Sequence, residues 1–594
     1  MSLLAGKTNT NQINRVTHVR PSAPRTTVQV RLSDGRIAEG EPGTTLEEFA
    51  CALNEHPDVP YIGALVNKDL QELTEPVWHD SDVELIDITD KDGMRIYRRS
   101  LVFLLVAAVA ELFPNAWVHV DHSMTFGGMF CRLEGRSPFT PQELIQLCER
   151  MQQLVDQNLP IQRMELPIQQ AAAEFRAHGD EEKASLLENS DKQTVAVYQL
   201  GTHRNHFHGY MAPSTGYLKV FDLVHYPPGF VLHFPRRHDP THLDPFQAMP
   251  RLTQVFQEYR EWLELLDVKN LPALNRAIDS GRIREVVLVA EALHEQRIAA
   301  IASVIANHRA QIGMVLIAGP SSSGKTTFAR RLSVQLMANG IHPIALGLDN
   351  WFVDREQTPL DEEGKPDFEA LEAIDLTLFN RQLSLLMAGE TVTLPHFDFR
   401  IGRKLPGETL HITPNHVILV EGIHGLNPRL APDIPSDRIF RIYISALTQL
   451  NLDRHNRVST TDTRIIRRIV RDAARRGYTA SDTIGRWPSV ERGEWRHIFP
   501  YQEHADVMFN SALVYELAAL RSLAEPLLLS VEPGTPERVE ADRLLSLLRW
   551  FHPCPTDIVP DNSILREFIG GSILEDFHPW QRRDNGTVVA APSS

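Results

Sequence analysis

The sequence has little of what an exported, membrane-embedded or generally nucleic-acid-binding protein needs. It has four cysteines in 594 residues and none in a CxxC pair, which excludes a disulfide framework and a zinc knuckle. Its most apolar run, Leu101–Ala110, is ten residues long and therefore too short to span a bilayer. The formal net charge of -16 lacks the excess of Lys and Arg that a nucleic-acid backbone requires.

The first residues also lack the apolar core of a signal peptide. We therefore expect a cytoplasmic protein that neither enters a membrane nor binds nucleic acid strongly. The apolar content of 42% and the charged content of 23% are those of an ordinary globular chain. Its length exceeds what one hydrophobic core usually serves, so several domains are expected.

Composition and periodicity divide the chain into six segments. An apolar alternation, turn residues and a capped helix at Leu46–Leu53 predict a small α+β domain near the start. A helix at Ile96–Leu112 and later short strands predict a second α+β domain. The expected segments are a flexible tail (1–25), the small domain (26–90), the second domain (91–250), a helical connector (251–311), an α/β domain (312–555) and a C-terminal tail (556–594). Within that tail, Asn562–Gly571 is amphipathic enough to pack back on the α/β domain.

From Gly313 the chain alternates apolar strands with helices. This rhythm predicts a parallel sheet with helices on both faces. The fold class is thus multidomain α/β, with two α+β domains before it. The expected strands are 314–318, 343–348, 417–420 and 439–444.

The strongest motif is GPSSSGKT at Gly319–Thr326, between an expected strand and an expected helix. It matches GxxxxGK[ST], whose glycines and successive N–H groups wrap around phosphates. Lys325 is expected to reach the β- and γ-phosphates of ATP, and the Thr326 hydroxyl to bind Mg²⁺. The expected nucleotide-binding residues are Gly319, Pro320, Ser321, Ser322, Ser323, Gly324, Lys325, Thr326 and Thr327. This motif alone does not separate a kinase from a GTPase or an ATPase motor.

Two carboxylates end expected strands of this domain. Asp349 follows PIALGL, and Glu421 ends VILVE. Because ligands bind beyond the carboxyl ends of parallel strands, Asp349 is a candidate base for an attacking hydroxyl. Glu421 has the form of a Walker-B residue and is a candidate Mg²⁺ ligand. Each could instead be an ordinary capping or loop acid.

Acidic and aromatic residues alternate between these two strands. Carboxylates suit ribose hydroxyls and rings suit stacking, so this pattern favours a sugar that carries a flat base. The same residues could instead serve a core and a turn. The candidate substrate residues are Glu369, Phe397, Asp398 and Arg400, together with Asp349.

An arginine-rich helix follows the Walker-B strand. TRIIRRIVRDAARRG puts Arg464, Arg467/Arg468, Arg471 and Arg475 on one helical face. Such a helix suits a lid whose guanidinium groups offset charge on a transferring phosphoryl group. A salt-bridged surface helix or an RNA-binding face would show the same pattern.

The motifs GPSSSGKTT, LDNWF, DFEALEAID, PHFDF, VEGIHGL and RRIVRD resemble, in this order, the uridine kinase and phosphoribulokinase group of P-loop kinases. The resemblance covers roughly 313–510. It implies transfer of the ATP γ-phosphoryl group to the 5′-hydroxyl of a uridine- or cytidine-like nucleoside, with Mg²⁺. It also implies a homo-oligomer, since related kinases associate.

The resemblance also assigns roles to residues. Asp349 matches the catalytic base, Glu369 a ribose-binding Asp, and Phe397 a Tyr of that family. Arg468, Arg471 and Arg476 match lid arginines that contact phosphates in that family. The expected catalytic residues are Lys325, Asp349, Arg468 and Arg471. Gly402 stands where family pyrimidine kinases carry a base-reading His, so the identity of the base stays open.

The N-terminal half resembles different proteins. Residues 26–90 are similar to a TGS domain, and 91–250 to the second additional, editing domain of threonyl-tRNA synthetases. The four metal-ligand positions of that editing site hold Arg99, Phe103, Phe207 and Met211. These cannot ligate zinc, so the resemblance implies neither zinc nor editing here. The whole chain resembles TGS-containing uridine kinase-like fusion proteins of bacteria.

Two alternatives to a nucleoside kinase stay open. The acceptor could be another small alcohol, as in phosphoribulokinases and pantothenate kinases. The chain could also be a non-catalytic nucleotide-sensing or RNA-associated regulator, with a weak RNA contact by its N-terminal half. A sensor has no need of a base, so the set Lys325, Thr326, Asp349 and Glu421 favours catalysis.

Overall fold

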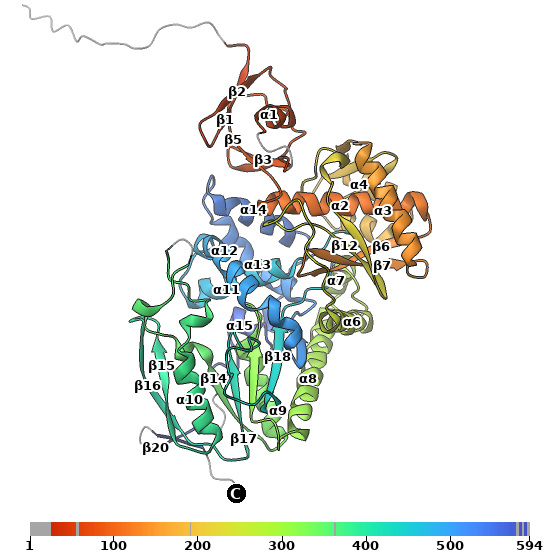
Figure 1. The fold of residues 1–594 in the computed structure, drawn as a ribbon. Helices are drawn as coiled ribbons and strands as arrows, with labels where there is room; N and C mark the ends of the chain where they lie inside the picture. The colour runs from red at the N-terminus through yellow and green to blue at the C-terminus, as the bar shows by residue number, and fades with distance from the viewer. Residues whose placement is uncertain are drawn as a thin grey trace, which may run out of the picture.

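A computed structural model describes residues 25–54, 59–190, 192–361 and 364–577 in full, and the backbone of 581–584 and 587–590. The flexible tail expected at 1–25 lies outside these residues except for Arg25. Figure 1 shows the small N-terminal domain at the top, the second domain beside α14, and the parallel-sheet domain below.

The small domain is a five-stranded mixed sheet with one helix. Its strand order is β2-β1-β5-β3-β4, in which β1 and β5 run parallel. A capping box formed by Thr45 and Glu48 starts the helix at the expected residue. The elements are β1 (Val28–Leu32), β2 (Ile37–Gly40), α1 (Leu46–Leu53), β3 (Gly63–Val66), β4 (Asp69–Glu72) and β5 (Ser81–Ile86).

The second domain packs two antiparallel sheets around a long helix, α2. Its sheets have the orders β11-β12-β7-β6 and β10-β9-β8. The apolar run 101–110 lies inside α2 and is mostly buried, and no helix among the described residues is long and apolar enough to cross a membrane. The elements are α2 (Lys91–Leu112), β6 (Trp117–Met124), β7 (Gly128–Glu134), α3 (Pro141–Asp156), β8 (Ile161–Pro167), α4 (Ile168–Ala177), α5 (Glu181–Glu188), β9 (Thr194–Leu200), β10 (His203–Asn205), β11 (Asp222–Tyr226) and β12 (Gly229–His233).

Three helices form the connector: α6 (Pro250–Leu265), α7 (Leu271–Asp279) and α8 (Ile283–Asn307). The connector is part of the core of the next domain, because α8 packs along α9 (Lys325–Ala338). Arg331 of α9, almost fully buried, pairs with Glu291 and Glu295 of α8 at 3.3 and 2.7 Å.

The third domain has the expected parallel sheet, with strand order β14-β17-β13-β18-β19. Alternate residues of β13 enter two separate cores, Val315 and Ile317 on one face and Met314 and Leu316 on the other. Helices therefore cover both faces, as the sequence predicts. The elements are β13 (Met314–Ala318), α9 (Lys325–Ala338), β14 (His342–Gly347), α10 (Leu376–Met387), β15 (Val392–Asp398), β16 (Arg403–Leu410), β17 (His416–Glu421), β18 (Ile439–Ser445), α11 (Thr460–Arg475), α12 (Ala480–His497), β19 (Val507–Asn510), α13 (Glu516–Leu529) and α14 (Pro536–Leu548).

The segment after α14 returns to this core. Ile564, Leu565 and Phe568 are fully buried around the short helix α15 (Arg566–Ile569). Asn562–Gly571 thus packs back on the α/β domain, as its amphipathic pattern suggests. Farther on, β20 (Gln581–Asp584) and β21 (Thr587–Ala590) pair antiparallel.

The second domain is joined to the third through apolar and charged contacts. Met124, Phe130 and Val231 share a core with Tyr443 and Met508. Beside this core, Lys183 and Asp453 form a fully buried ion pair at 3.2 Å. Lys183 also donates a hydrogen bond of 3.0 Å to the carbonyl oxygen of His206.

Because the Asp453 carboxylate is buried, water cannot take the place of the Lys183 ammonium that neutralises it. We expect Lys183→Met to lower the free energy of unfolding by about 3 kcal/mol or more, since it leaves an uncompensated buried charge. Urea unfolding at neutral pH measures this. Lys68→Met, which removes the half-exposed ion pair of Lys68 with Glu84, is the matched control and should cost less than about 1 kcal/mol. Equal effects of the two substitutions would contradict the role of the buried pair.

Candidate active site

The loop between β13 and α9 folds tightly against the end of β18. A Cβ atom at position 319 would lie 1.9 Å from the carbonyl oxygen of Ile444, so Gly319 fits and a side chain does not. Gly324 has φ +86°, a conformation that glycine adopts at little cost. The backbone therefore wraps closely at the N-terminus of α9, which favours negative charge.

Lys325 and Thr326 begin α9. The Lys325 ammonium donates to the carbonyl oxygens of Gly319 and Pro320, at 2.9 and 3.1 Å. The Thr326 hydroxyl donates to the Glu421 carboxylate, with distances of 2.9 and 3.1 Å to its two oxygens. Hydroxyl and carboxylate oxygens are the ligands that Mg²⁺ prefers, so this pair fits such an ion.

Asp349 and Glu421 leave the same edge of the sheet. Gly347 of β14 is in register with Glu421 of β17, and Asp349 follows two residues later in a 3₁₀ turn, Leu348–Trp351. Burial raises the pKa of Glu421 to about 7, helped by the nearby Glu567 and Asp349 and opposed by Lys325 and Thr326. The Asp349 carboxylate reaches solvent, yet desolvation in the crevice raises its pKa against the pull of Lys325 and Arg476.

Glu369 is the third carboxylate of this crevice. Desolvation raises its pKa to about 7, and Glu494 adds to the effect while Arg468 and Lys325 oppose it. Its side chain packs against Gly493 of α12, where a Cβ atom would lie 2.6 Å from the Cβ of Glu369. The structure thus brings Lys325, Asp349, Glu369 and Glu421 into one electrostatically coupled site.

The arginines of α11 lie on a continuous helix, as expected, and divide into two groups by the partners that they contact. Arg464 pairs with the buried Glu494 and donates to the carbonyl oxygen of Ser321 at 3.1 Å. Arg467 pairs with Glu516 and donates to the carbonyl oxygen of Ser322 at 3.3 Å. Both side chains are almost fully buried, and they fix the phosphate loop through its carbonyl oxygens.

The second group gathers around a carboxylate of α11 itself. Arg468, Arg471 and Arg476 surround Asp472, at 3.2, 2.9 and 3.6 Å. Arg468 also donates to the Ser321 hydroxyl at 2.9 Å. Burial lowers the pKa of Arg468 and of Arg476, and among the opposing charges are Glu369 for Arg468 and Asp349 for Arg476.

Two expected substrate residues serve a turn instead. Asp398 accepts hydrogen bonds from the backbone N–H groups of Arg400 and Ile401, at 2.8 and 3.4 Å, and so closes the β15–β16 hairpin. The Arg400 side chain is 94% exposed. The candidate site therefore does not include Asp398 and Arg400, because local backbone donors already satisfy the carboxylate and solvent surrounds the guanidinium.

Phe397 is a core residue of an aromatic cluster. It is buried against Phe352 and Phe399, with ring centroids 5.6 and 5.1 Å away. The rings that remain exposed in this cluster are Phe368 and Phe399. They, and not Phe397, offer a free face for stacking.

Gly402 adopts a left-handed backbone conformation, with φ +68°. A Cβ atom there would lie 2.8 Å from Nε of Arg355, and Arg355 donates to the carbonyl oxygen of Phe399 at 2.7 Å. An arginine thus occupies the space beside Gly402.

Sequence reasoning missed two carboxylates that support the phosphate loop. Glu494 of α12 accepts a hydrogen bond of 2.9 Å from the backbone N–H of Ser321. Glu567 of α15 accepts from the backbone N–H and the hydroxyl of Thr327, at 3.1 and 2.9 Å. Both belong to helices outside any recognisable motif, so no local pattern could have identified them.

The four positions that match the synthetase editing site do come together in the second domain. The rings of Phe103 and Phe207 lie 5.3 Å apart, and Met211 accepts a weak hydrogen bond from Ser100 at 3.9 Å. Arg99 donates to the carbonyl oxygen of Tyr210. Across the described ranges, no three His, Cys, Asp or Glu residues are grouped to hold a metal ion.

Comparisons with known proteins find relatives of both the C-terminal domain and the N-terminal region. Residues 314–518 match the model of the phosphoribulokinase / uridine kinase family, so the chain carries a C-terminal P-loop kinase domain of that family. The N-terminal region is similar to threonine–tRNA ligases. That of Laribacter hongkongensis is 30% identical over 196 residues, or 33% of this chain and 31% of the ligase, and that of Janthinobacterium sp. (strain Marseille) is 31% identical over 198 residues, with the same two shares.

This chain thus spans about a third of the length of these ligases. Among solved structures, a "Possible Uridine Kinase from Bacillus stearothermophilus" is 21% identical, with 34% of this chain and 89% of that chain covered and a TM-score of 0.23.

The raised pKa of Glu421 has a testable consequence for stability. Because the folded state holds the proton to about pH 7 and the unfolded state releases it near pH 4.5, this residue makes unfolding easier as pH rises between these values. The free energy of unfolding of Glu421→Gln, measured relative to that of the native protein, should therefore rise by about 2 to 3 kcal/mol between pH 5 and pH 8. Urea unfolding of both proteins in EDTA at the two pH values measures the difference. A difference that does not change with pH would contradict the assignment.

Proposed function

We propose that this protein transfers the γ-phosphoryl group of ATP to the 5′-hydroxyl of a nucleoside. The observation that carries the proposal is the Asp349 carboxylate at the sheet edge, electrostatically coupled to the phosphate-loop Lys325. A carboxylate in this position is what a hydroxyl acceptor needs and what a nucleotide sensor does not. The family of the C-terminal domain supports the same reading.

In the proposed reaction, the acceptor oxygen attacks the γ-phosphorus and the bond to the bridging oxygen of ADP breaks. Asp349 accepts the hydroxyl proton, and its raised pKa makes it a better base than an exposed carboxylate. Lys325, Arg468 and Arg471 offset charge on the transferring group, while Arg476 contacts the nucleotide. Arg464 and Arg467 fix the loop that orients the phosphates.

Thr326 and Glu421 would hold Mg²⁺ in this site. The ion supplies charge compensation to the β- and γ-phosphates when it is bound. Deprotonated Glu421 is the form that binds a cation, so magnesium affinity should rise as pH passes about 7.

The acceptor side favours a ribose with an attached base. Glu369 lies in the same crevice as Asp349 and can accept from a ribose hydroxyl, and the exposed faces of Phe368 and Phe399 suit a flat ring. Arg355 lies beside Gly402, so the identity of the base stays open.

We expect Asp349→Asn to lower kcat by about 10² to 10⁴ with little change in ATP affinity, because the amide cannot take the proton. The assay follows ADP release with ATP, Mg²⁺ and a panel of nucleosides, ribulose 5-phosphate and pantothenate. Asp398→Asn, in the hairpin turn, is the matched control and should keep most of its activity. Turnover that survives Asp349→Asn would disprove the base, and ADP release with the non-nucleoside alcohols alone would disprove the acceptor class.

Glu369→Gln tests recognition of the ribose. An amide can still accept one hydrogen bond but carries no charge, so we expect kcat/KM for ribonucleosides to fall about tenfold, mostly through KM. For the corresponding 2′-deoxynucleoside, kcat/KM should fall by less, because this acceptor presents one hydroxyl fewer. Equal losses for the two acceptors would remove Glu369 from the ribose site.

A further inference from the structure

A cavity of about 1060 Å³ lies between the second domain and the kinase domain. Its walls come from α2 and β7 on one side and from the start of α11, α12 and α14 on the other. Arg464 and Glu494, which hold the phosphate loop, also line it. This pair therefore stands between the cavity and the nucleotide site, and neither Asp349 nor Lys325 belongs to the cavity wall.

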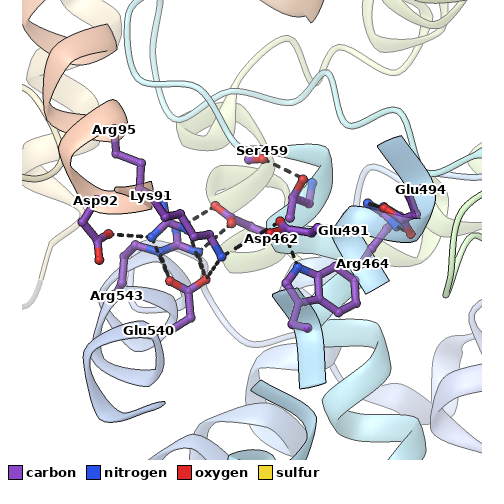
Figure 2. Close-up of polar contacts among 12 residues, drawn as sticks. Lys91, Asp92, Arg95, Ser459, Asp462, Arg464, Glu491, Glu494, Glu540 and Arg543 are labelled. Atoms are coloured by element: carbon purple, nitrogen blue, oxygen red, sulfur yellow. Dashed lines mark hydrogen bonds and ion pairs between the residues drawn. The ribbon is translucent and has the colours of Figure 1, made fainter. Parts of the chain in front are cut away.

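Several basic residues around this cavity are already neutralised by ion pairs with carboxylates of the protein. Arg543 of α14 pairs with Asp462 and Glu540, and Glu540 in turn pairs with Arg95 and Lys91 of α2. Figure 2 shows this chain of contacts from α2 through α14 to α11. It fixes the two domains to each other and leaves these charges unavailable to a ligand.

Among the guanidinium groups of the wall that form no ion pair with a carboxylate of the described residues are those of Arg98 and Arg457. Arg98 makes no hydrogen bond or ion pair there, its Nε is buried, and its neighbour is the ring of Phe234 at 5.8 Å. Arg457 donates to the carbonyl oxygen of Asp121 at 3.2 Å and to the Ser123 hydroxyl. The Asp121 carboxylate itself is engaged by Arg260 and Arg132, at 3.3 and 3.5 Å.

The Arg98 guanidinium is poorly compensated, because its buried Nε has no hydrogen-bond partner and the opposing charge of Asp462 acts without a direct ion pair. Burial lowers the pKa of Arg98 to about 10, and repulsion from Arg95, Arg457 and Arg99 adds to this while Asp462 opposes it. Burial likewise lowers the pKa of Arg457 to about 10, against the attraction of Asp121 and Asp462. Packing alone gives no reason to hold like charges together in a desolvated cavity, whereas an anion would relieve the repulsion.

We propose that this interdomain cavity binds a small phosphate-bearing molecule of nucleotide size, with its phosphate between Arg98 and Arg457. Guanidinium groups match phosphate oxygens in geometry and charge. The volume suits a nucleotide-sized ligand, and the net charge of -16 disfavours a long nucleic acid.

Calorimetric titration with inorganic pyrophosphate, without magnesium, tests this on the full-length protein. Lys325→Met is the background, so that the phosphate loop contributes little to binding. We expect one site per chain, whose affinity falls at least tenfold when Arg98→Gln or Arg457→Gln is added. Arg176→Gln is the matched control, since Arg176 is paired with Glu181 and Glu188 on the surface of α4, and it should leave the affinity unchanged.

Stability separates a binding role from a structural one. Removal of a poorly compensated charge should leave the Tm of ligand-free Arg98→Gln equal to or above that of its parent, while the rise in Tm on adding pyrophosphate disappears. A lower Tm without ligand, or pyrophosphate affinity that ignores both substitutions, would overturn the proposal. So would Arg98-dependent binding of a short single-stranded RNA that exceeds the binding of pyrophosphate, because the ligand would then be a nucleic acid.

Discussion

Two buried guanidinium groups of α11 determine the shape of the nucleotide site. Arg464 and Arg467 each donate to a carbonyl oxygen of the phosphate loop, while Glu494 and Glu516 neutralise them. A buried pair of this kind adds little net stability, but loss of either partner would leave an unpaired charge behind the loop. The loop conformation thus depends on α11 and α12 as well as on its own glycines.

The same helix joins the nucleotide site to the N-terminal half. Asp462, in the first turn of α11, pairs with Arg543 of α14, and Glu540 of α14 pairs with Arg95 of α2. Charged groups alternate in sign along this path, so each is compensated by the next. The second domain and the kinase domain therefore share one continuous polar network beside their apolar contact.

Features that depend on local sequence could be predicted, and features that depend on tertiary contacts could not. The helix Leu46–Leu53 and the strand Met314–Ala318 follow from capping and apolar pattern, and the structure has them at the expected residues. Asp349 and Glu421 were found because parallel strands end at a common edge. The two roles of the α11 arginines and the turn role of Asp398 depend on which neighbours the fold supplies. Glu494 and Glu567 carry no local signal at all.

The support that α15 gives to α9 has a consequence for how the protein matures on the ribosome. Glu567 satisfies the first turn of α9, and Ile564 packs so closely on Gly324 that an added Cβ would lie 2.5 Å from it. About 240 residues separate these contacts along the chain. The phosphate loop is therefore synthesised long before the residues that complete it. During translation the phosphate loop therefore lacks the contacts of Glu567 and Ile564 until α15 has been synthesised.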